Sequence, residues 1–156
     1  MGLEQYQAKW QTPFAVLGIR TSGDWLTDIE YLPVGTPTLA PLTRLAERVC
    51  RQLDRYLDDP HFQFDLPFEY RGTVFQCKVW RAIASIPVGE KRRYVDLARL
   101  LATAPRAVGN ACGANRLPII IPCHRVVAAQ GLGGFMRARD GFPLDIKKWL
   151  LEHEGG

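Results

Sequence analysis

The four cysteines of this 156-residue chain form no C-x-x-C pair, and its cysteines and histidines show no zinc-finger spacing. The sequence therefore signals neither a disulfide framework nor a local metal site. No apolar run approaches the ~20 residues of a membrane span, and the amino terminus lacks a basic start followed by an apolar stretch. We expect free thiols in a reducing compartment, a cytoplasmic location and no membrane contact.

The sequence also lacks an extreme content of hydrophobic or charged residues. Hydrophobic residues make up 47% of the chain and charged residues 23%, which is typical of a soluble globular protein. The length allows one good core or two small cores, and excludes a long multidomain enzyme. The net charge of +4 permits a polyanionic partner, but it is equally consistent with simple solubility.

The chain divides near Gly72, which predicts an amino-terminal α/β domain over 1–71 with a structural role and a second domain over 72–156. Residues 13–32 predict two strands joined by a turn at Gly23-Asp24. The segment 42–59 has apolar residues at helical spacing, among them Cys50, which we expect to be a packing residue. Residues 61–67 alternate between apolar and polar and predict a third short strand.

The second half is expected to be mainly helical. Thr73 can cap a helix over 74–86, and residues 94–115 predict two short helices with a turn from Ala102 to Pro105. Thr103 is expected as the N-cap of the second helix, with Pro105 in its first turn. Two short helices joined by a tight turn form a candidate helix-turn-helix, although many such pairs never bind DNA.

The sequence IIIPCHRVV, residues 119–127, places a nucleophile beside a base at the end of an apolar run. The run predicts a strand that ends at Pro122. Adjacent side chains on a regular strand face opposite sides, so either the backbone bends at Cys123 and His124 or a water relays the proton. A structural role for both residues is the simpler alternative, but packing gives no reason for the histidine.

IPCHRVV resembles the active-site signature of the O6-alkylguanine-DNA alkyltransferases, which transfer an alkyl group from damaged guanine to their own cysteine. Further similar motifs follow in the family's order: FQCKVW, PVGE, YVDLA, RAVGNACGAN, GGFM and KKWLLEHEG. The amino half is similar only in outline. The resemblance implies an α/β (α+β) fold, with a ribonuclease-H-like small antiparallel sheet and helix, then a winged-helix-like domain with the helix-turn-helix.

The resemblance also implies roles for individual residues. Cys123 would accept the alkyl group, His124 would remove its proton through a water, and Glu154 would orient His124. Asn115 would tie the recognition helix to the cysteine loop, and Tyr94 would donate a proton to the departing guanine. The implied DNA-contacting residues are Arg106, Ala107, Tyr94, Gly109, Asn110 and Arg93, with Arg106 as the finger that fills the gap in the base stack. The implied pocket residues are Val126, Phe135, Met136 and Cys112.

This chemistry explains why the cysteine lies in an apolar run. Attack by sulfur on a saturated carbon needs a desolvated thiolate and a proton for the leaving base, but no oxyanion hole. An apolar site raises a cysteine pKa, so a positioned base must generate the thiolate. The product is a thioether, so one molecule should repair one lesion irreversibly.

The expected partner is double-stranded DNA containing alkylated bases, contacted in the minor groove with the damaged nucleotide flipped out. We expect a monomer without cofactor or zinc; cooperativity on DNA, alkyl size and activity on O4-alkylthymine stay open. The alternatives are a binding-only alkyltransferase-like sensor, a Cys-His hydrolase and a plain helix-turn-helix regulator. Two departures from the family are a helix-turn-helix connector about two residues shorter than its commonest form and a longer loop over 136–145.

Overall fold

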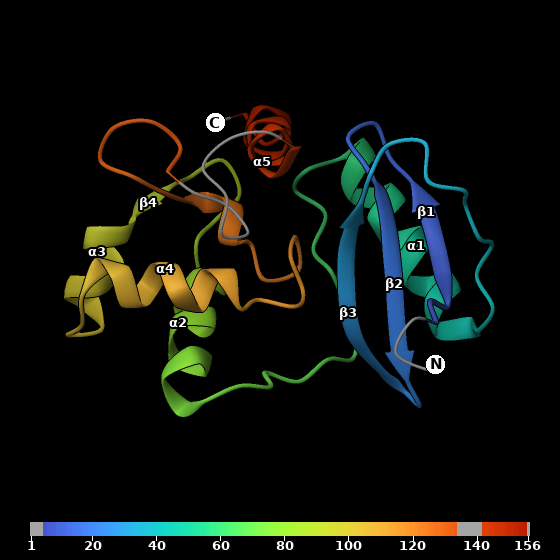
Figure 1. Ribbon diagram of the computed structural model, residues 1–156, viewed down its shortest axis with the longest axis horizontal. Helices are drawn as coiled ribbons and strands as arrows, with labels where there is room; N and C mark the ends of the chain where they lie inside the picture. Colours follow the sequence, from blue (N-terminus) through green and yellow to red (C-terminus); the bar gives the residue numbers. More distant parts are fainter. Residues whose placement is uncertain (1–4, 134–141, 156) are drawn as a thin grey trace. The chain divides into compact units, whose positions relative to one another are not determined.

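The computed structural model of the protein describes residues 5–133 and 142–155. The chain divides into two compact units, Met1–Glu69 and Tyr70–Gly156. The first consists of a small antiparallel sheet with one helix, and the second is mainly helical (Figure 1). The expected mixed α/β fold class is therefore confirmed.

The sheet of the first unit has the strand order β1-β2-β3, with both pairs antiparallel. The expected hairpin is formed by β2, Val16–Ser22, and β3, Trp25–Leu32, and Gly23 in its turn has a φ of 58°. Glycine adopts this left-handed conformation without steric cost. The third strand is β1, Ala8–Gln11, which the sequence analysis missed because its four residues are too few to show a clear alternation.

Helix α1, Arg44–Asp58, packs on one face of this sheet (Figure 1). Its N-cap is Thr43, whose side chain accepts a hydrogen bond from the Ala46 backbone nitrogen. Cys50 lies on the buried face of α1, as expected for a packing residue. The helix begins at Arg44, two residues later than the predicted range, and Leu42 precedes it as an exposed residue.

The strand predicted over 61–67 is wrong. This segment belongs to no strand. At its end the Pro67 carbonyl accepts from the Leu26 backbone nitrogen of β3 at 2.8 Å, but the backbone of Asp65 bonds to a side chain of α1. The Gln52 amide donates to the Asp65 carbonyl at 3.0 Å and accepts from the Asp65 backbone nitrogen at 2.9 Å. A side-chain amide offers the same donor and acceptor as a peptide group, so it satisfies the backbone without forming a ladder.

The second unit begins with α2, Val74–Ala84, whose expected cap at Thr73 is confirmed as a capping box with Gln76. Helices α3, Tyr94–Leu100, and α4, Pro105–Gly113, form the expected pair and contact each other closely. The indole nitrogen of Trp80 on α2 donates to the Ala111 carbonyl at 2.8 Å. This bond attaches α4 to α2.

The turn between α3 and α4 differs from the prediction in its capping residue. Ala104, not Thr103, is the N-cap of α4, with Pro105 at the first helical position. The Thr103 backbone nitrogen donates to the Ala98 carbonyl at 2.8 Å and so terminates α3. Ala102 adopts a φ of 54° in this Schellman-type ending, a position usually occupied by glycine. Because Thr103 is used to end α3, it cannot also serve as the N-cap of α4.

Residues 119–121 form a turn rather than the predicted strand. The Ile121 backbone nitrogen donates to the Leu117 carbonyl at 2.8 Å, and Ile119 has a φ of 75°. Left-handed backbone is unfavourable for a β-branched residue, so this turn is held by its buried surroundings. A short 3₁₀ helix, Cys123–Arg125, follows directly.

Two elements complete the second unit around this 3₁₀ helix. Strand β4, Arg92–Arg93, pairs in parallel with β5, Val126–Val127, so the start of α3 lies beside the residues that follow the cysteine. Helix α5, Phe142–His153, packs against the 3₁₀ helix. The loop expected over 136–145 therefore ends before Phe142. Across the described ranges, no helix is both long and apolar enough to span a membrane.

Candidate active site

Cys123 is buried, and its sulfur accepts a hydrogen bond from the Asn115 side-chain amide. The same Asn115 nitrogen donates to the Ile121 carbonyl at 2.9 Å and to the Cys123 Sγ at 3.2 Å. The Asn115 side-chain oxygen accepts from the Leu117 backbone nitrogen at 2.9 Å. Asn115 thus connects the residues just after α4 to both ends of the turn that precedes the cysteine.

His124 lies beside Cys123 in sequence, but its bonded partner is the distant Glu154. Its Nε2 lies 2.8 Å from the Glu154 Oε2, and both side chains are 1% exposed. A carboxylate can only accept a hydrogen bond, so Nε2 must be the protonated nitrogen. This assignment leaves Nδ1 as the unprotonated acceptor of a neutral imidazole. Nδ1 is buried and has no hydrogen-bond partner among the described residues.

The backbone bends between the two residues, which was one of the two arrangements left open by the sequence. In the 3₁₀ helix, Cys123 and His124 no longer alternate as they would on a strand. The third member, Glu154, is held where α5 ends, and its backbone nitrogen donates to the Leu150 carbonyl at 3.0 Å. The structure therefore brings together Cys123, His124, Glu154 and Asn115 as a single cluster.

The local environment disfavours charge on both the thiol and the imidazole. The neighbouring Cys112 thiol and burial raise the pKa of Cys123 well above its ordinary value, whereas the Asn115 amide and the Lys147 ammonium lower it. Burial lowers the pKa of His124, against an opposite effect from Glu154. At neutral pH the resting site therefore holds a thiol and a neutral imidazole, and a proton must move before the sulfur becomes strongly nucleophilic.

Lys147 on α5 is a buried lysine that the sequence analysis did not single out. Its Nζ donates to the carbonyls of Val126 and Leu132, both at 2.7 Å, and lies 5.8 Å from the centre of the Tyr94 ring. Burial lowers the pKa of Lys147 to about 8. An amphipathic helix pattern gives no sign of this position, because lysine is rarely placed in a core.

Tyr94 is the first residue of α3 and lies against two glycines of other segments. A Cβ added at Gly133 would lie 3.0 Å from the Tyr94 ring, and one added at Gly109 would lie 4.0 Å from it. Gly133 also has a φ of 74°. Small residues on α4 and in the segment after β5 thus leave room for the tyrosine ring.

The exposed face of α4 contains the residues predicted to contact DNA. Arg106 and Asn110 are exposed and one turn apart, and Ala107 and Gly109 beside them are partly exposed. Val108 and Ala111 form the buried face. Arg93, just before α3, is exposed and pairs with Asp96, which also accepts from the Arg93 backbone nitrogen at 3.2 Å. A face of this kind, small and positively charged, can approach another surface closely.

The predicted substrate pocket is described only in part. Val126 is buried directly after the 3₁₀ helix, and Cys112 is half-buried near the end of α4, close to Cys123. Phe135 and Met136 lie outside the described residues.

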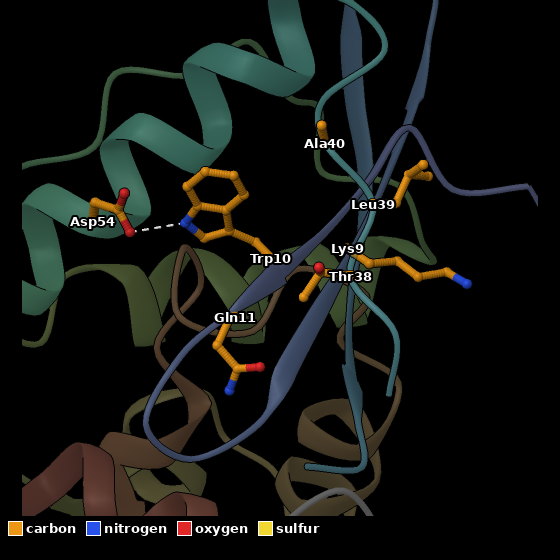
Figure 2. Close-up of a pocket in the computed structure, with 7 residues that line it drawn as sticks. All are labelled: Lys9, Trp10, Gln11, Thr38, Leu39, Ala40 and Asp54. Carbon is orange, nitrogen blue, oxygen red and sulfur yellow. Dashed lines mark hydrogen bonds between the residues drawn. The ribbon is translucent and has the colours of Figure 1, made fainter. Parts of the chain in front are cut away.

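A separate pocket lies in the first unit and contains no residue of the cysteine cluster (Figure 2). It has a volume of about 330 Å³, and within it Trp10 donates its indole hydrogen to Asp54 at 2.8 Å. Its lining residues are Lys9, Trp10, Gln11, Thr38, Leu39, Ala40 and Asp54. None of them is a cysteine or a histidine, so this pocket lacks the thiol and imidazole that lie together at Cys123 and His124, and we place the chemistry there.

Arg125 is the other residue that sequence analysis missed. Its guanidinium donates to both oxygens of Glu154, at 2.9 and 3.0 Å, and to the Ile86 carbonyl at 2.7 Å. The available signal was its position inside IPCHRVV, where a cation next to an apolar run needs a buried partner. Helix α2 therefore also contributes to the site through the residues that follow it.

Together, the fold and the site define a small α/β protein in which a helix pair stands next to a buried cysteine, histidine and glutamate. A family model described as "6-O-methylguanine DNA methyltransferase, DNA binding domain" matches residues 74–156. The methylated-DNA--protein-cysteine methyltransferase of Candida albicans is 35% identical over 150 residues, which cover 91% of this chain and 83% of that protein. This chain belongs to the methylated-DNA--protein-cysteine methyltransferase family.

Two further comparisons agree with this assignment. A probable methylated-DNA--protein-cysteine methyltransferase of Acanthamoeba polyphaga mimivirus is 48% identical over 92 residues, which cover 58% of each chain. The crystal structure of Mycobacterium tuberculosis OGT in complex with DNA has a TM-score of 0.78 and 35% identity, and the match covers 94% of this chain and 90% of that one. The resemblance inferred from the motifs is thus confirmed across both units.

Proposed function

We propose that this protein repairs DNA by transferring the alkyl group of O6-alkylguanine in a duplex to the sulfur of Cys123. The observation that carries the proposal is the unpaired, buried Nδ1 of His124, whose other nitrogen is bound by Glu154. A buried acceptor atom without a partner is costly unless it has a use. Removal of the neighbouring thiol proton is such a use.

The proposed reaction needs one proton acceptor and one proton donor. The Cys123 proton passes to Nδ1 of His124 through a water, and the sulfur attacks the alkyl carbon as the bond from that carbon to O6 breaks. The departing guanine then takes a proton from Tyr94. Asn115 donates to the sulfur at 3.2 Å and lowers its pKa, which favours the thiolate during this step.

The proposed reaction ends in a thioether. A carbon–sulfur bond of this kind has no low-barrier hydrolysis, unlike the acyl-cysteine of a hydrolase. One protein molecule should accept one alkyl group and then remain inactive. We propose O4-alkylthymine as a second substrate to be tested against O6-alkylguanine in the same assay.

The alkylated base lies inside the duplex, so it has to leave the stack. We propose that α4 enters the minor groove, that Arg106 fills the space left behind and that Tyr94 crowds the phosphate of the flipped nucleotide. The exposed Arg106 at the second position of α4 supports this role. The protein would act in the cytoplasm as a monomer bound through phosphate contacts, with affinity that falls steeply as salt rises.

The test is to mix the protein with duplex DNA containing O6-methylguanine and to measure the mass of the intact protein and of its tryptic peptides. We expect one methyl group on the Cys123 peptide, at one equivalent and no more. Cys123→Ser should bind the DNA without accepting methyl, and Cys77→Ser is the matched control that should still accept it. Binding without modification would favour a damage sensor, and repeated turnover would indicate a hydrolytic reaction instead.

A further inference from the structure

Arg125 uses all of its guanidinium nitrogens at the cysteine cluster. Nε and Nη2 donate to the two oxygens of Glu154, and Nη1 donates to the Ile86 carbonyl. Its side chain is 12% exposed, against 1% for Glu154. A planar guanidinium bound to both oxygens of a carboxylate fixes the orientation of that carboxylate as well as its position.

Arg125 and His124, both bound to the Glu154 carboxylate, differ in character. The cation of Arg125 already neutralises it, and His124 Nε2 shares its Oε2 at 2.8 Å. If Arg125 were absent, the full negative charge of a buried carboxylate would act on the imidazole and favour its protonated form. With Arg125 present, a protonated His124 would be the second cation at a carboxylate that Arg125 already balances.

We propose that Arg125 is a positioning residue that holds Glu154 against His124 Nε2 and keeps the imidazole neutral, so that Nδ1 stays available to accept the Cys123 proton. This inference deepens the proposed function and rests on it. Arg125 does not touch the reacting atoms. It acts through Glu154 on the protonation state of the base.

Several other ionisable groups face His124. Lys147 lies on α5 and Glu154 follows directly after it, whereas Cys123 and Arg125 flank His124 in the 3₁₀ helix. The Cys112 thiol of α4 neighbours Cys123. Burial lowers the pKa of His124, Glu154 raises it, and Arg125 and Lys147 lower it. The Lys147 ammonium donates to the Val126 and Leu132 carbonyls, whereas the Arg125 guanidinium donates to both oxygens of the Glu154 carboxylate. Of the two cations, Arg125 is thus the one placed to balance Glu154.

The turn after α2 holds Arg125 in this position. The Ile86 carbonyl accepts from Nη1, which prevents the guanidinium from rotating away from Glu154. Gly89 in the same turn has a φ of 82°, and a Cβ there would lie 3.3 Å from the Glu154 carbonyl oxygen. The PVGE motif therefore lies against the backbone of Glu154 as well as ending α2.

The experiment compares Arg125→Gln, Arg125→Lys and the wild-type protein, with Arg51→Gln as a control of equal charge change. Arg51 is an exposed residue of α1. The pKa of His124 is measured by NMR titration of the imidazole in the unreacted protein. We expect Arg125→Gln to raise it by about one unit or more, because the carboxylate is left unbalanced. Arg125→Lys and Arg51→Gln should each stay within about half a unit of the wild type.

The rate of methyl transfer to Cys123 at different pH values gives the second readout. If the pKa of His124 is raised, the imidazole stays protonated up to a higher pH and cannot accept the thiol proton there. The acidic limb of the Arg125→Gln rate–pH profile should therefore shift to higher pH, by the same amount as the His124 pKa measured by NMR. A uniform loss of rate at every pH, with an unchanged His124 pKa, would mean that Arg125 only supports the fold and would overturn the proposal.

A measurement on the wild-type protein keeps the idea testable if Arg125→Gln does not fold. The proposal requires the imidazole of His124 to be neutral at pH 7 despite its contact with Glu154. An imidazole that is protonated at pH 7 in the wild type would contradict it. The titration does not depend on transfer, so a wild-type protein that fails to accept methyl would refute the proposed function and leave the test of Arg125 intact.

Discussion

Asn115 donates from one nitrogen both to the Ile121 carbonyl and to the Cys123 sulfur, at 2.9 and 3.2 Å. The first bond holds the turn that precedes the cysteine, and the second favours the charged form of the thiol. One side chain therefore links the position of the nucleophile to its reactivity.

Replacing Asn115 should affect stability and transfer differently in two variants. Asn115→Ala leaves the Leu117 nitrogen without a partner and removes one of the two donors to the Ile121 carbonyl, which still accepts from the Cys123 backbone nitrogen at 2.8 Å. We therefore expect a loss of about 1–3 kcal/mol in the free energy of unfolding. Asn115→Asp keeps the acceptor for Leu117 but places negative charge beside the sulfur, so transfer should fall further than in the alanine variant. Urea denaturation and single-turnover rates measure the two effects, and faster transfer in Asn115→Asp would contradict this assignment.

Gly133→Ala tests the placement of the Tyr94 ring. Gly131 and Gly133 both have left-handed φ values, of 79° and 74°, but a Cβ at Gly131 meets nothing within 4 Å. Both variants should lose about 1–2 kcal/mol of stability from backbone strain. Gly133→Ala should in addition slow methyl transfer, because its Cβ displaces the ring. Equal transfer rates in the two variants would show that the ring position does not matter.

Arg106→Ala separates a role in base flipping from a role in phosphate contact. If Arg106 fills the stack, its loss should slow transfer from duplex DNA about tenfold or more, and should have little effect with a single-stranded substrate, which has no stack to open. Lys78→Ala on the exposed face of α2 removes the same charge and serves as the control. A variant equally slow on both substrates would argue against the flipping role.

Cys50 should react far more slowly than Cys77 in the folded protein. Burial, with a smaller effect from Asp54, raises the pKa of Cys50 to about 12, so almost no thiolate forms near pH 8. Labelling with iodoacetamide followed by peptide mass measurement should modify the half-buried Cys77 well before Cys50, and unfolding in urea should make the two react alike. Equal labelling in the folded state would mean that α1 does not shield Cys50.

Ala102→Gly should stabilise the protein by about 0.5–1 kcal/mol, because glycine adopts the observed φ of 54° without steric cost. Thermal or urea unfolding measures this gain. Ala104→Gly is the comparison, since Ala104 has an extended φ of −98° and no strain to relieve. A destabilised Ala102→Gly variant would show that the left-handed turn is not strained.

Local patterns predicted the elements whose stability comes from their own residues. The hairpin over Val16–Leu32 has glycine in its turn, α1 has periodic apolar positions, and α2 has a complete capping box, so each could be inferred from neighbours in sequence. Predictions failed where hydrogen bonds outside a regular helix or strand decide the backbone conformation. The 61–67 segment bonds to Gln52, and the 119–121 run is bent by contacts that its apolar composition does not reveal.

The sequence by itself determined the fold class, the helix pair and the family, because order and spacing of motifs are properties of the chain. The tertiary structure decided which side chains of the site form hydrogen bonds with one another. His124 adjoins Cys123 in sequence, yet its proton is fixed by Glu154 thirty residues away, and Arg125 balances that carboxylate. Hydrogen bonds depend on distance and direction in space, and only the folded chain sets these for residues that lie far apart along it.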